Sequence, residues 1–330
     1  MNENFWFNKV FLTSGCSYTT RLEYIKEELD IIDSPNDDKT LIHHIGLASS
    51  SIQHLKNSII SFVDYFLKNG INRENIYVVG NLTQIGRRSY KFNKNENKYI
   101  LKLINEVVEF KEDNSLPDFN FKKYPLGFCE LDDDIYSSLI VNTELYNPLP
   151  NDIKKGIFTF MDYHNKLTME ELVENYFTDL IIIQEYLKKN KIEYTFYFMN
   201  NIIEGWNATY STHLYNNFYG KFEVPDLTNT HNIKNISSKV NSLFNLIDFD
   251  NIVCYSTEKQ KYGGMDEYAI DNFKPTDFAG LETLEIKDYY GPQFTFFGKH
   301  PLENVQIKFE EKFIHPKMES FIKKHYKNII

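Results

Sequence analysis

The sequence predicts an α/β protein whose parallel sheet is covered by helices on both faces. Short apolar runs rich in β-branched and aromatic residues alternate with longer segments of helical periodicity. Such alternation is typical of parallel sheets, because the crossover between two parallel strands usually carries a helix. The 330 residues, of which 42% are hydrophobic, can bury a sizeable core. We expect a single α/β domain over residues 1–330.

Five apolar runs are predicted as buried strands. Each is short and consists mainly of residues that favour strands. The predicted strands are 9–13, 41–46, 75–82, 192–199 and 252–255. In open parallel sheets the active site lies beyond the carboxyl ends of the strands. This rule directs attention to the residues that follow Thr13, Gly46, Gly80 and Met199.

Four helical regions are predicted. The first covers about 17–28, and the second begins after a run of serines suited to helix N-caps and stops before Gly70. The third opens with Thr168 and Glu171, which have the spacing of a capping box. The fourth, 302–327, is divided at Pro316, because proline cannot continue a helix but suits the first turn of a new one.

Two regions lack a regular pattern. Residues of about 90–165 combine charged stretches with scattered prolines and are interpreted as an inserted lobe. Residues of about 202–240 are interpreted as irregular loops. Both would shape a substrate pocket in an enzyme.

Charge and cysteine content restrict the function classes. The net charge is −10, from 36 basic and 46 acidic residues, which argues against nucleic acid as the main partner. No run approaches the roughly 18 apolar residues that span a bilayer, and no signal peptide is recognised, so we expect a cytoplasmic protein without a membrane partner. The three cysteines are far apart and do not suggest a metal site or a disulfide scaffold. No cofactor is predicted.

The strongest chemical motif is Ser14-Gly15-Cys16-Ser17-Tyr18-Thr19, directly after the first strand. A hydroxyl at the start of a helix, surrounded by backbone N–H groups, is placed to attack an acyl carbon and to stabilise an oxyanion. The alternative is a serine that only caps the helix. A nucleophile also needs a base, and the best candidate among nine histidines is His300, followed by Pro301 before the last helical region.

These motifs resemble the blocks of the SGNH (GDSL-like) hydrolases. Gly15-Cys16-Ser17 resembles the Gly-Asp-Ser of the first block, and His300-Pro301 resembles the histidine of the last. Residues 45–51 and 78–83 occupy the places of the second and third blocks. The order agrees from residue 9 to about 325. The resemblance implies a three-layer α/β/α sandwich with a flavodoxin-like parallel sheet.

The resemblance also implies the role of each site residue. Ser17 would be the nucleophile and His300 the general base. The oxyanion hole would use the N–H groups of Ser17 and Ser49, with Asn81 or Thr83 in place of the family's third-block asparagine. That asparagine position falls on Leu82 in the simplest alignment.

The family's acid is missing from its usual place. Gly298 and Phe297 stand where an aspartate should precede the histidine by two or three residues. Asp288 is the nearest upstream aspartate and Glu303 lies three residues beyond the histidine. A backbone carbonyl from residues 295–299 is the alternative orienting group.

The predicted activity is ester hydrolysis by a serine nucleophile, on a small-molecule or glycan ester such as an O-acetyl group. Arg87, just after the third strand, is placed at the pocket rim to hold an anionic group on a substrate, and a plain surface position is the alternative. An acyltransferase would use the same nucleophile. The competing hypothesis is a catalytically impaired SGNH-like fold that serves as a binding or structural protein. Members of this family occur in phages as well as bacteria, so a virion location would follow for a phage-encoded chain.

Overall fold

The chain folds around a five-stranded sheet in which all neighbouring strands are parallel. In this computed structural model the strands are β1 (Lys9–Ser14), β2 (Thr40–His44), β3 (Ile76–Leu82), β4 (Glu193–Phe198) and β5 (Ile252–Val253). They lie in the order β2-β1-β3-β4-β5. Leu12 of β1 pairs with His43 on one side and with Val78 on the other. The predicted α/β class with a parallel sheet is confirmed.

The structure describes only part of the chain. The described residues are 9–15, 40–45, 51–83, 85, 151, 152, 155, 156, 159, 163, 166–204, 233, 236–258, 261–273 and 303–325. The predicted helix at 17–28, almost all of the lobe at about 90–165 and most of the loops at about 202–240 lie outside them.

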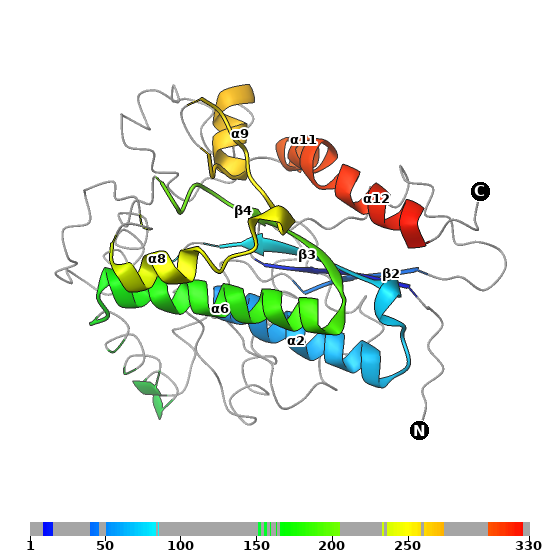
Figure 1. Ribbon diagram of the computed structural model, residues 1–330, viewed down its shortest axis with the longest axis horizontal. Helices are drawn as coiled ribbons and strands as arrows, with labels where there is room; N and C mark the ends of the chain where they lie inside the picture. The colour runs from blue at the N-terminus through cyan, green and yellow to red at the C-terminus, as the bar shows by residue number, and fades with distance from the viewer. Residues whose placement is uncertain are drawn as a thin grey trace.

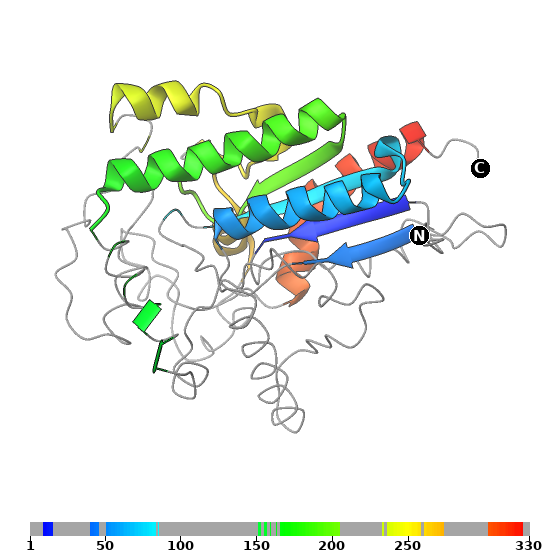
Figure 2. The ribbon, with the colours of Figure 1, turned by 90° about the horizontal axis from the view of Figure 1, so that it is seen from below.

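Helices cover both faces of the sheet (Figure 1). One face carries α2 (Ile52–Lys68), α6 (Met169–Asn190) and α8 (Ser238–Phe244). The opposite face carries α9 (Met265–Asn272), α11 (Glu303–Phe313) and α12 (His315–His325). Single 3-10 turns, Arg73–Asn75 and Phe249–Asn251, precede β3 and β5. Figure 2 shows α2 and α6 running along the strands.

Local sequence signals explain the two long helices. Ser51 caps α2 by accepting a hydrogen bond from the His54 N–H at 3.2 Å. Thr168 and Glu171 form the predicted capping box of α6, with the Thr168 N–H donating to the Glu171 carboxylate at 2.7 Å. Both helices bury one apolar stripe against the sheet. Their predicted positions are confirmed.

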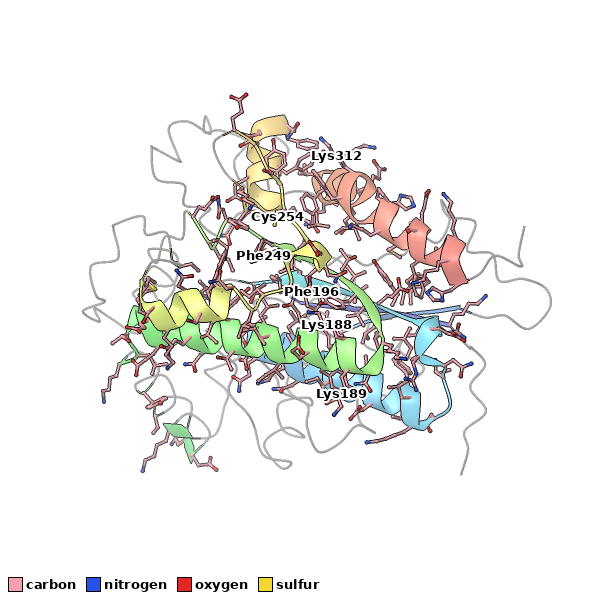
Figure 3. All side chains as sticks on the ribbon, viewed as in Figure 1. Lys188, Lys189, Phe196, Phe249, Cys254 and Lys312 are labelled. Atoms are coloured by element: carbon pink, nitrogen blue, oxygen red, sulfur yellow. The ribbon has the colours of Figure 1, made fainter. Side chains whose placement is uncertain are left out.

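Two hydrophobic cores result, one on each face. Side chains alternate along β3: Val78 and Leu82 belong to the core under α2 and α6, whereas Tyr77 and Val79 belong to the core under α9, α11 and α12. Phe196 of β4 lies in the first core (Figure 3).

The last two helices pack on the same face of the sheet, α11 near the carboxyl ends of the strands and α12 near their amino ends. Phe309 of α11 contacts Tyr197 near the end of β4, with ring centroids 5.7 Å apart. Phe321 of α12 contacts Tyr77 near the start of β3, at 4.7 Å. At the amino edge, Nε2 of His325 lies 2.7 Å from the carboxylate of Glu193.

The structure adds detail that the sequence does not predict. Helices α8 and α9 have seven and eight residues and are not expected from periodicity. The predicted last strand stops at Val253, because Tyr255 pairs with Gly263 in an isolated antiparallel bridge. The helical break near Pro316 is confirmed, since α11 ends at Phe313 and α12 begins at His315. In the described ranges, no helix is long and apolar enough to cross a membrane.

Candidate functional site

The carboxyl edge of the sheet contains a switch point between β1 and β3. The chain moves outward from β1 to β2, and then crosses back over β1 to form β3. Connections that leave neighbouring strands in opposite directions open a crevice beyond their carboxyl ends, where ligands bind in open α/β sheets. Ser14 and Gly15 end β1 at this point, and residues 81–83 end β3.

The start of α2 lies at the same edge. Nε2 of His54 lies 3.1 Å from the carbonyl oxygen of Ile45, just past β2. Because a carbonyl oxygen only accepts, Nε2 carries the proton. The positive end of the helix dipole and the first N–H groups of α2 therefore point towards the crevice side of the sheet.

Ser14 has a structural role at this edge. The Ser58 hydroxyl donates to the backbone carbonyl of His54 at 2.8 Å. In the 2.8 Å contact between the two hydroxyls, Ser14 is therefore the donor and Ser58 the acceptor. This contact ties the end of β1 to α2.

Asn81 and Thr83 are the two predicted oxyanion donors that the structure describes, and both are fully buried. Asn81 follows Val79 by two residues on β3, so it points towards the face covered by α9, α11 and α12. The Thr83 hydroxyl has no hydrogen-bond partner within the described ranges. Ser17, Ser49, His300, Asp288 and Arg87 lie outside the described residues.

Hydrogen bonds join the end of β4 to the turn before α9 and to the first residues of this helix. The Met199 N–H donates to the Leu82 carbonyl at 3.0 Å, and the Met199 carbonyl accepts from the Asp266 N–H at 2.9 Å. The Glu267 carboxylate accepts from the N–H groups of Asn201 at 2.9 Å and Gly264 at 2.7 Å. Burial raises the pKa of Glu267, although these hydrogen bonds oppose the shift.

Glu204, which follows β4, adds hydrogen bonds between the end of β4 and the segment before α9. One carboxylate oxygen accepts from the N–H groups of Lys261 at 2.8 Å and Tyr262 at 3.2 Å. Sequence reasoning missed this junction. The signal that would have found it is Glu267 three residues after Gly264, the spacing at which a glutamate caps the N-terminus of a helix.

Cys254 lies directly after β5, and its thiol is partly buried (Figure 3). Burial raises the pKa of its thiol to about 12, so the thiolate is scarce at neutral pH. In the ranges that the structure covers, no three His, Cys, Asp or Glu side chains are grouped to hold a metal ion.

Comparisons with known proteins give no family assignment. No family model, no curated protein and no solved structure matches the chain.

Proposed function

We propose that the chain is an ester hydrolase of the SGNH type with a serine nucleophile and a histidine base. The observation that carries the proposal is the switch point at the carboxyl edge of the sheet. Gly15 and Ser51, the described residues nearest to Ser17 and Ser49, lie at this edge, and Phe309 of the helix that follows His300 packs against Tyr197 near the end of β4.

Covalent geometry strengthens this argument. Ser17 and Ser49 are each two residues from a described neighbour and so lie within ~7 Å of its Cα, because a residue spans at most ~3.6 Å. His300 is three residues from Glu303, which limits that separation to ~11 Å. The strand order β2-β1-β3-β4-β5 is the flavodoxin-like order, which the resemblance to this family implies.

The proposed reaction is acyl transfer to water in two steps. Ser17 Oγ attacks the ester carbonyl carbon while His300 takes its proton, and the developing oxyanion accepts hydrogen bonds from backbone N–H groups and from Asn81 or Thr83. The C–O bond to the alcohol breaks, and His300 returns the proton to the leaving alcohol. Water then attacks the acyl-serine, gives up its proton through His300, and releases the acid. O-acetyl groups on a glycan are one candidate substrate.

A fluorophosphonate probe and p-nitrophenyl acetate test the proposal. We expect labelling and turnover in the natural chain and their loss in Ser17→Ala. Ser14→Ala is the matched control, because the Ser14 hydroxyl is occupied in the contact with α2. Folded protein with no Ser17-dependent labelling or turnover would contradict the proposal and favour a binding or structural protein.

A further inference from the structure

We draw no further inference here: the strongest candidate, the half-buried aromatic patch that Tyr255, Phe273 and Phe313 form around Tyr268 between α9 and α11, is an apolar surface, and nothing in the structure shows what covers it.

Discussion

Several polar side chains at the carboxyl edge form hydrogen bonds that hold the fold together. Ser14 and His54 bind α2 and the end of β2, and Glu267 caps backbone N–H groups. Each of these groups has its hydrogen-bonding capacity used by the fold. Asn81 and Thr83 lie among them, at the end of β3, with their side chains fully buried.

We expect the two His-Pro histidines to differ in their effect on catalysis. His300→Ala should abolish ester turnover, because the nucleophile would lose its base. His315→Ala should retain most of it, because His315 begins α12, the helix whose Phe321 packs against Tyr77 near the start of β3. The measurement is kcat with p-nitrophenyl acetate in both variants. Equal losses in two folded proteins, or loss from His315→Ala alone, would show that the base is misassigned.

Gly264 is predicted to tolerate no side chain. A Cβ at this position would lie 2.4 Å from the Phe198 carbonyl oxygen and 2.7 Å from the Asn200 nitrogen, which are backbone atoms that cannot move aside. We expect Gly264→Ala to lower the free energy of unfolding by about 3 kcal/mol or more, at or beyond the upper end of overpacking effects. Urea unfolding measures the loss.

Gly70→Ala is the matched control for Gly264→Ala. Gly70 has φ of +92° and nothing within 4 Å of an added Cβ, so its cost is limited to backbone strain of about 1–2 kcal/mol. A smaller loss from Gly264→Ala than from Gly70→Ala would mean that the close approach of the turn to β4 is not rigid.

Residues of the site differ in how far sequence can predict them. Asn81 and Thr83 follow a clear apolar strand, so their place at the sheet edge is predictable from the strand itself. The burial of His54 and Asp266 is not, because polar residues are usually exposed and their burial depends on partners distant in the chain. The polar residues at this edge whose burial only the structure reveals are therefore those that contact other segments of the chain.

At the scale of elements, Asp248 joins α6 to β4 and the turn before β5. Its carboxylate accepts from the Tyr194 hydroxyl at 3.0 Å, from the Asn251 amide at 2.9 Å, and lies 3.3 Å from the Lys188 ammonium. Its backbone exchanges two hydrogen bonds with the Gln184 side chain, at 2.9 and 3.0 Å. Partial burial raises its pKa, but these polar contacts outweigh burial and lower the pKa overall.

This lowered pKa predicts a loss of stability in acid. A carboxyl whose pKa is lower in the folded state contributes stability that is fully present above its unfolded pKa of about 3.9, and loses it as the pH falls through the folded value. We expect Asp248→Asn to be less stable than the natural chain by about 1 kcal/mol at pH 7, a modest value because the group is partly exposed. The difference should vanish towards about pH 2. Urea unfolding from pH 7 to pH 2 measures it.

Asp250→Asn provides the control for the pH experiment. Asp250 belongs to the same 3-10 turn, and its side chain is not part of the Asp248 contacts. A difference between Asp248→Asn and the natural chain that grows as the pH falls would contradict the prediction.

Length and local signals determine which elements are predictable. Helices α2 and α6 have 17 and 22 residues, N-caps and a continuous apolar stripe, and both agree with the sequence pattern. Helices α8 and α9 are too short for periodicity to stand out, and packing against the sheet stabilises them instead. The strands are predictable because parallel strands are buried on both faces and read as apolar runs.

At the scale of the whole molecule, the topology gathers distant segments at one edge. Parallel strands place every strand's carboxyl end on the same side, and helices that return antiparallel to the strands begin there. The ends of β1, β3 and β4 and the starts of α2 and α9 lie at this edge, although they span residues 14 to 265 of the chain. A site at this edge needs no special loop lengths, only the parallel order of the sheet.

The last prediction follows from this topology. Ser17, Ser49, Asn81 or Thr83 and His300 should converge in a crystal structure of the phosphonate-labelled protein, which traps the serine as a covalent adduct. We expect His300 within hydrogen-bond reach of Ser17 Oγ, about 3 Å. A separation of more than about 10 Å between Ser17 and His300, too far for base catalysis, would contradict the hydrolase proposal. With Ser17 and His300 paired, Asp288 against the other imidazole nitrogen would indicate a rebuilt triad, and a backbone carbonyl in that place would indicate a dyad.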